Sequence, residues 1–164
     1  MIDLYAELKA VIGALQGAKV PHALCGGLAL MVYQRPRATV DIDIVIPPEA
    51  TEALTAAVAP RGFRPHPRPM RLDPPGIEIL RLYKTDPDGP DVLTLDCLLT
   101  SHPIVAEAWR SRTEVPFERG AVSVVSSRSM IALKRLRSSP QDLLDIETLQ
   151  ALEERRPEET GADA

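Results

Sequence analysis

The segment TVDIDIVI, residues 39–46, constrains the fold more than any other part of the sequence. Apolar residues recur at every second position, which is typical of a strand with one face in the core. The predicted core face consists of Val40, Ile42, Ile44 and Ile46. The opposite face consists of Asp41, Asp43 and Val45. The pattern therefore predicts a rigid strand that presents two carboxylates side by side.

Two carboxylates held this close repel each other unless a positive group lies between them. Mg²⁺ is the natural partner, because it prefers oxygen ligands and takes few of them from protein. A third carboxylate, Asp96, lies in the apolar run 91–99, which is a second predicted strand. If the two strands are neighbours, Asp41, Asp43 and Asp96 can hold two metal ions about 3.5–4 Å apart, as in phosphoryl-transfer sites.

A glycine pair, Gly26–Gly27, separates a short buried strand at 22–25 from the helix-compatible segment 28–34. Glycines let the backbone approach a ligand closely, and the start of a helix favours anions. A Gly-Gly pair or an Asp-x-Asp pair alone is commonly only a turn or a solvated strand surface. In this order and on these elements, the two together predict a cradle for a triphosphate whose magnesium reaches the aspartates.

The remaining pattern predicts one domain over residues 1–156 and a flexible acidic tail at 157–164. Half of the 16 prolines lie between residues 60 and 90, which predicts irregular or edge structure around residues 60–76. Helices are expected at 3–17, 49–59, 126–137 and 139–155, a further short one at 102–110, and hairpins at 77–84/91–99 and 113–117/121–125.

Composition excludes several classes of protein. The chain has 164 residues, a net charge of −4 and 4% aromatic residues, so it is neither a broadly basic nucleic-acid binder nor a base-stacking platform. The three histidines lack zinc-site spacing. Cys25 and Cys97 lie in apolar runs and are expected to be buried thiols. With no signal peptide or membrane-spanning run, we expect a cytoplasmic protein with no membrane partner.

The blocks GGLAL (26–30) and RPRATVDIDIVI (35–46) resemble the AbiEii/AbiGii-type branch of the nucleotidyltransferase superfamily. That superfamily has a Gly-Gly or Gly-Ser turn, an Asp-x-Asp strand and a later third aspartate, which Asp96 matches. In this branch an arginine and a threonine precede Asp-x-Asp, matched by Arg37 and Thr39. A lysine-bearing helix followed by a D-x-x-D helix also recurs, matched by MIALKRL (130–136) and QDLLDI (141–146).

The resemblance implies an α+β fold with a mixed β-sheet flanked by helices. It also implies Mg²⁺-dependent transfer of a nucleoside monophosphate from an NTP, such as ATP, to an acceptor hydroxyl. RNA, tRNA or protein is the expected acceptor, and some members are toxins or antitoxins. The predicted catalytic residues are Asp41, Asp43, Asp96 and Lys134. The predicted nucleotide-binding residues are Gly26, Gly27, Arg37, Thr39 and Lys134, and the aspartates are the ligands of two magnesium ions.

Two other functions remain open at this point. The chain is small, so it could instead be a catalytically weak, antitoxin-like partner that uses the fold to contact a cognate protein. It could also be an antibiotic nucleotidyltransferase, which would require an acidic pocket for a cationic drug. The local arginines of residues 61–71 give that last alternative no support, and they are themselves interpreted as solubilising loop charge.

Several supporting residues have a structural interpretation beside the functional one. Lys134 could reach the triphosphate or lie along the core with its charge in water. Arg37 could touch phosphate or be a surface arginine, and Thr39 could bind a carboxylate or simply suit a strand. Asp142, three residues after Ser139, is interpreted as a helix cap, and Asp145 as a side chain that orients Lys134.

Overall fold

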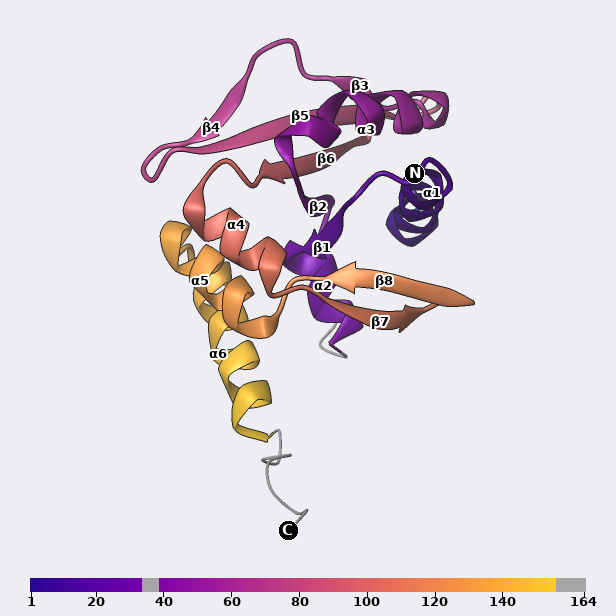
Figure 1. Ribbon diagram of the computed structural model, residues 1–164. Coiled ribbons are helices and arrows are strands. Elements are labelled where there is room, and N and C mark those ends of the chain that lie inside the picture. Colours follow the sequence, from indigo (N-terminus) through magenta and orange to yellow (C-terminus); the bar gives the residue numbers. More distant parts are fainter. Residues whose placement is uncertain (34–38, 156–164) are drawn as a thin grey trace.

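The computed structural model describes residues 1–33 and 39–155, which form a mixed β-sheet with helices around it (Figure 1). Over these residues the sheet has eight strands in the order β3-β5-β6-β2-β1-β8-β7, with β4 pairing beside β5. The strands are β1 (Ala23–Cys25), β2 (Asp41–Ile46), β3 (Arg64–Pro65), β4 (Met70–Leu72), β5 (Ile77–Thr85), β6 (Val92–Leu99), β7 (Thr113–Phe117) and β8 (Gly120–Val124).

Two parallel pairs at the centre of the sheet are flanked by antiparallel ones. β2 runs parallel to β6, and β1 runs parallel to β8. β1 is antiparallel to β2, β5 to β6, and β7 to β8. The two hairpins expected from the sequence are therefore present, and the expected mixed sheet is confirmed.

The helices are α1 (Leu4–Gly17), α2 (Gly26–Val32), α3 (Thr51–Val58), α4 (Pro103–Arg110), α5 (Ser127–Arg137) and α6 (Pro140–Arg155). Helix α5 packs against α4 and α6, and these three lie together at the left of Figure 1. Helix α1 packs against α3, and both lie on the right. None of the helices in residues 1–33 and 39–155 is long and apolar enough to cross a bilayer, and a cytoplasmic location stays a prediction.

The sequence-based element boundaries hold with small shifts. Helix α2 begins at Gly26, two residues earlier than expected. The helix expected at 49–59 is divided into a 3₁₀ turn, η1 (Pro48–Ala50), the helix α3, and a second 3₁₀ turn, η2 (Ala59–Arg61). The proline-rich segment 60–76 contains the short strands β3 and β4, which pair with β5. The domain limits 1–156 stay a prediction, and residues 157–164 lie outside the described part of the chain.

The core confirms most of the predicted strand faces and corrects one residue. Ile42, Ile44 and Ile46 are fully buried, as are both cysteines, which carry free thiols. Val40 is 73% exposed because β2 begins only at Asp41. Val45, on the same strand face as the aspartates, is fully buried. The aspartate face is therefore polar only at the start of the strand and apolar at its end.

This gradient predicts different stability effects for two chemically identical substitutions. Val45→Ala should lower the free energy of unfolding by about 2 kcal/mol, because it removes buried methyl groups and leaves a cavity. Val40→Ala is the matched control and should change it by less than about 0.5 kcal/mol. Urea denaturation with unchanged m-values measures both, and equal effects would contradict the burial of β2 described above.

Candidate active site

Three aspartates meet where the parallel strands β2 and β6 run side by side. Asp43 lies directly opposite Asp96 across the strand pair, and Asp41 lies opposite Thr94. Because side chains two residues apart share a face of the sheet, Asp41, Asp43 and Asp96 project from the same face. Thr94 donates a hydrogen bond of 2.5 Å from Oγ1 to Asp41 Oδ1. The expectation that the strands carrying these aspartates are neighbours is therefore confirmed.

The surroundings of Asp43 disfavour its charged form. Burial has the largest effect, the charges of Asp96 and then Asp41 add to it, and together they raise the pKa of the Asp43 carboxyl to about 7. Arg137 and Lys134 oppose this rise by attraction, and no hydrogen bond from a described residue does so. A carboxylate in this setting is stabilised by a cation placed beside it. A cation beside Asp43 would thus lower the pKa of its carboxyl and hold it in the charged form.

Asp96 has a partner that the sequence analysis did not identify. Arg81 on β5 lies directly opposite Asp96 in the β5–β6 hairpin. Its Nε and Nη2 donate to Asp96 Oδ1 and Oδ2 at 2.7 and 2.6 Å, which is a bidentate ion pair. The alternation of residues 77–84, combined with the hairpin register, could have placed Arg81 on the aspartate face.

Among the described residues, no three acidic, histidine or cysteine side chains are already gathered as a metal-binding cluster.

Gly26 lies against Asp43 because β1 is antiparallel to β2 and Cys25 pairs with Asp43. Its φ of +66° is in the left-handed region that favours glycine. A Cβ at this position would overlap Asp43 Oδ2 and lie 2.8 Å from both Cβ and Cγ of Asp43. The turn therefore requires glycine for two independent reasons, its backbone conformation and the space it leaves beside the carboxylate.

Helices α5 and α6 supply a buried positive group with its own acidic partners. Lys134 is buried, and its Nζ donates to Asp145 Oδ2 at 2.7 Å and lies 3.6 Å from Asp142 Oδ1. The interpretation that Asp145 orients Lys134 is confirmed. Asp142 accepts hydrogen bonds from the backbone and hydroxyl of Ser139, and Ser139 accepts one from the Asp142 backbone, so the predicted cap is also confirmed.

Arg137, one turn after Lys134, also pairs with Asp142. Its Nε and Nη2 donate to the two carboxylate oxygens at 2.8 and 3.0 Å. This pairing, together with Ser139, holds the pKa of Asp142 well below its usual range. Arg137 lowers the pKa of Asp43 more than Lys134 does. The sequence pattern led to Lys134 but not to Arg137, although a position three residues later lies on the same helix face.

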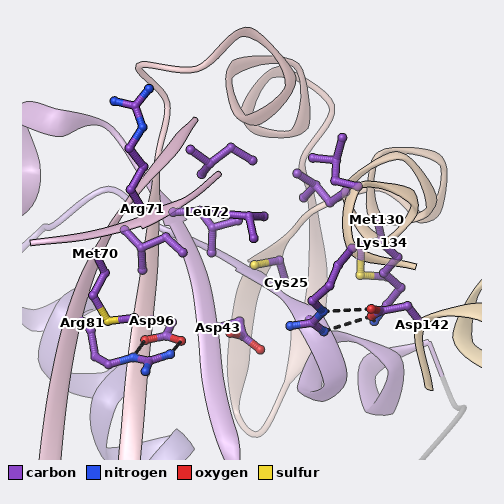
Figure 2. Close-up of a pocket in the computed structure, with 17 residues that line it drawn as sticks. Cys25, Asp43, Met70, Arg71, Leu72, Arg81, Asp96, Met130, Lys134 and Asp142 are labelled. Atoms are coloured by element: carbon purple, nitrogen blue, oxygen red, sulfur yellow. Dashed lines mark hydrogen bonds and ion pairs between the residues drawn. The ribbon is translucent and has the colours of Figure 1, made fainter. Parts of the chain in front are cut away.

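A cavity of about 290 Å³ joins these groups (Figure 2). One wall consists of aliphatic side chains from β4, β5 and β6, and the other of aliphatic side chains from α5. Its charged lining residues are Asp43, Asp96, Asp142, Arg71, Arg81, Lys134 and Arg137. No aromatic side chain lines it among the residues described. The cavity therefore has apolar walls, and its charged lining includes the strand aspartates Asp43 and Asp96 and the α5 cations Lys134 and Arg137.

The structure brings together four of the predicted site residues as cavity lining, namely Gly26, Asp43, Asp96 and Lys134. Asp41 is next to them on β2, and Gly27 follows Gly26 in α2. Thr39 precedes β2 and is half-buried. Arg37 lies outside the described residues. Of the arginines at 61, 64, 68 and 71, only Arg71 lines the cavity.

The close approach at Gly26 generates a stability prediction. Gly26→Ala should lower the free energy of unfolding by at least about 2 kcal/mol, because a positive φ costs on the order of 1–3 kcal/mol and the new methyl group overlaps Asp43. Gly13→Ala, inside α1 with no atom within 4 Å of its Cβ, is the control and should be neutral or stabilising. Thermal and urea unfolding measure both, and a neutral Gly26→Ala would contradict the described turn.

The raised pKa of Asp43 generates a pH prediction for the metal-free protein. Since the folded-state pKa of Asp43 lies near 7 and its ordinary value is 3.8, the folded state binds an extra proton between these values. The contribution of Asp43 to stability is therefore fully present below about pH 4 and is lost as pH rises through 7. Asp43→Asn should remove this loss, raising stability at pH 8 by roughly 2 kcal/mol and much less at pH 5.

Denaturation in EDTA at both pH values measures this effect. The control is Asp88→Asn, in the exposed turn between β5 and β6, which should change neither value by more than about 0.5 kcal/mol. An equal effect of Asp43→Asn at pH 5 and pH 8 would show that Asp43 is ionised at both.

Comparison with known proteins gives structural likeness without sequence likeness. No protein-family model matches the sequence, and no curated protein matches it. The structure of ANT(2")-Ia in complex with adenylyl-2"-tobramycin aligns with a TM-score of 0.62 and 18% identity, over 90% of this chain and 87% of that one. The lincosamide antibiotic adenylyltransferase LnuA, lincomycin-bound, aligns with a TM-score of 0.55 and 14% identity, over 90% and 96%.

A candidate nucleotidyltransferase from Thermotoga maritima, TM1012, aligns with a TM-score of 0.55 and 14% identity, over 92% of this chain and 90% of that one. These alignments span nearly the whole of each chain, so the likeness extends to the complete fold rather than to one motif. At such identities the likeness concerns the fold alone. The chain has the nucleotidyltransferase fold.

Proposed function

We propose that this chain is a magnesium-dependent nucleotidyltransferase that moves a nucleoside monophosphate from an NTP to an acceptor hydroxyl. The observation that carries the proposal is the register of β2 and β6, which sets Asp43 opposite Asp96 and Asp41 beside them. The cavity that starts at these aspartates, with Gly26 on one side and the α5 cations on the other, supports it. Carboxylates for a metal ion beside cations for phosphate suit a triphosphate bound with its metal, and the fold supports the same conclusion.

The residues fit Mg²⁺ by two observations. The donor set is made of carboxylates on one face of the sheet, and the raised pKa of Asp43 marks a buried carboxyl whose charged form a cation would stabilise. The glycine at position 26 lets the backbone lie directly against the Asp43 carboxylate, where a Cβ would overlap it. Asp41 and Asp43 would hold the metal, with Asp96 as a third ligand. When bound, the metal neutralises charge on the reacting phosphate and on the leaving pyrophosphate.

The side chains of the chain itself have separable roles in the proposed reaction. The backbone at Gly26 and Gly27 approaches the triphosphate, and Lys134 and Arg137 supply positive charge to it. Arg37 and Thr39 are proposed as further nucleotide contacts. The acceptor oxygen forms a bond to the α-phosphorus, the bond to the bridging oxygen breaks, and pyrophosphate leaves. The proton of the acceptor hydroxyl passes to a carboxylate oxygen of Asp96.

The acceptor follows from less direct observations. The AbiEii/AbiGii-type resemblance favours RNA, tRNA or protein as the acceptor and a toxin–antitoxin role, with a cognate protein as partner. A catalytically weak, antitoxin-like protein of the same fold is the alternative. Such a protein would bind its partner without transferring label in the assay below.

Antibiotic modification is the second candidate, favoured by the likeness to ANT(2")-Ia and LnuA over nearly their full length. The cavity limits which drug could serve. Of its acidic side chains, Asp96 and Asp142 are already paired with Arg81 and Arg137, and Asp43 is assigned to the metal. Its walls are aliphatic. We therefore propose that a drug acceptor, if there is one, is an uncharged or weakly charged molecule with an apolar body, rather than a polycation.

The test is transfer of label from each of four α-labelled NTPs in Mg²⁺, with total RNA, cell extract or a panel of antibiotics as acceptor. Wild type should transfer label, and Asp43→Asn should lower the rate by roughly 10²–10³-fold, because it removes charge where the metal and phosphate bind. Asp88→Asn in the exposed β5–β6 turn should transfer at the wild-type rate.

The labelled species then identifies the acceptor and the nucleotide. Equal transfer by wild type and Asp43→Asn would contradict the proposed chemistry at this site. No transfer with any acceptor would point to a missing acceptor or partner if calorimetry still shows nucleotide–Mg²⁺ binding. No transfer and no binding would favour the antitoxin-like alternative.

A further inference from the structure

The ion pair between Arg81 and Asp96 occupies a group that the proposed function assigns to the metal. Both oxygens of the Asp96 carboxylate accept a hydrogen bond from the same guanidinium, at 2.7 and 2.6 Å. Asp96 is 8% exposed, so water contributes little to its solvation. Arg81 therefore supplies the countercharge to this carboxylate inside the fold.

Arg81 and a metal ion are competitors for the same carboxylate. Each carboxylate oxygen keeps one further lone pair, but the guanidinium places a positive charge within bonding distance of both oxygens. A divalent cation bound to Asp96 would be repelled by that charge at short range. Among residues 1–33 and 39–155, no side chain forms a comparable ion pair with Asp43, which lies directly opposite Asp96.

The position of Arg81 would also let its side chain reach a second negative partner in the cavity. Its side chain is about one-third exposed and lines the same cavity as Asp43 and Gly26 (Figure 2). A guanidinium released from Asp96 would remain at the cavity wall, where an anionic ligand such as a triphosphate can accept its fork of N–H donors. Arg81 can thus move between two negative partners without leaving the site.

We propose that Arg81 is a placeholder for the metal ion: it neutralises Asp96 while the metal is absent, and it must release Asp96 for the three-aspartate site to assemble. The inference rests on the proposed function, since it takes Asp41, Asp43 and Asp96 as metal ligands. It makes Arg81 a positioning residue that acts through Asp96. Removing the placeholder should tighten metal binding, whereas removing a residue that merely orients Asp96 should weaken it.

The sign of that change is the test. Mn²⁺ takes the same oxygen ligands as Mg²⁺, and its binding to the nucleotide-free protein is measured by titration calorimetry and by the electron paramagnetic resonance signal of free Mn²⁺. Arg81→Gln should lower the Kd on the order of tenfold, the effect of removing one nearby like charge. Arg71→Gln, an arginine of the same cavity that pairs with Asp73, is the control and should leave the Kd unchanged.

Two further variants keep the result interpretable. Asp96→Asn combined with Arg81→Gln should show no gain over Asp96→Asn alone, since the gain acts through Asp96. Arg81→Lys, which retains charge but cannot form both hydrogen bonds, should give an intermediate Kd and guards against misfolding of Arg81→Gln. Circular dichroism and thermal unfolding confirm that each variant is folded.

The outcomes separate this inference from the function on which it rests. If wild type binds Mn²⁺ in a manner lost in Asp43→Asn, but Arg81→Gln and Arg81→Lys bind it equally or more weakly, the placeholder role is overturned and the metal site stands. If neither wild type nor any Arg81 variant binds Mn²⁺, the metal site itself is overturned and the inference with it.

Discussion

The parallel pairing of β2 with β6 is the constraint on which the rest of the site depends. Its register sets Asp43 opposite Asp96 and leaves Asp41 one pleat away on the same face. A shift of one residue in either strand would turn its aspartates into the core, where Ile42 and Ile44 now lie fully buried. The hydrophobic face of these strands therefore fixes the position of the carboxylates as firmly as any contact that the carboxylates make.

The charge that this register concentrates is compensated unevenly. Asp96 is held by Arg81 across the hairpin, and Asp142 by Arg137 across α5 and α6. Within the described part of the chain, Arg137 and Lys134 offset burial and the like-charged neighbours of Asp43 only in part, and the pKa of Asp43 rises to about 7. The site is thus most open to a cation at Asp43. The backbone of Gly26 lies against the same carboxylate, where no larger residue would fit.

Features of local pattern were accessible from the sequence. The alternation of residues 39–46 predicted β2 and the two carboxylates on one of its faces, and the spacing of Ser139 and Asp142 predicted a cap that the hydrogen bonds confirm. The interaction of Asp145 with Lys134 was accessible as well, because helix α6 follows α5 after a short connection.

Features that depend on strand order and register were less accessible. Arg81 contacts Asp96 only because the β5–β6 hairpin closes with one particular register, and nothing in residues 77–84 alone fixes it. Val40 fits the alternation but is exposed, since β2 begins at Asp41, two residues later than the pattern suggests. The resemblance at the glycine and aspartate blocks led to the fold, while its AbiEii/AbiGii-type branch stays a prediction.

The most direct test of a metal site at the junction of β2 and β6 is to locate the bound metal. Fe²⁺ binds oxygen ligands in place of Mg²⁺, and with ascorbate and peroxide it cleaves the backbone close to where it is bound. The account predicts cuts, identified by mass spectrometry, near residue 26, within 41–43 and within 95–97, all suppressed by excess Mg²⁺. Cleavage confined to other segments, or cuts at these segments that persist in excess Mg²⁺, would contradict a metal site at the junction of β2 and β6.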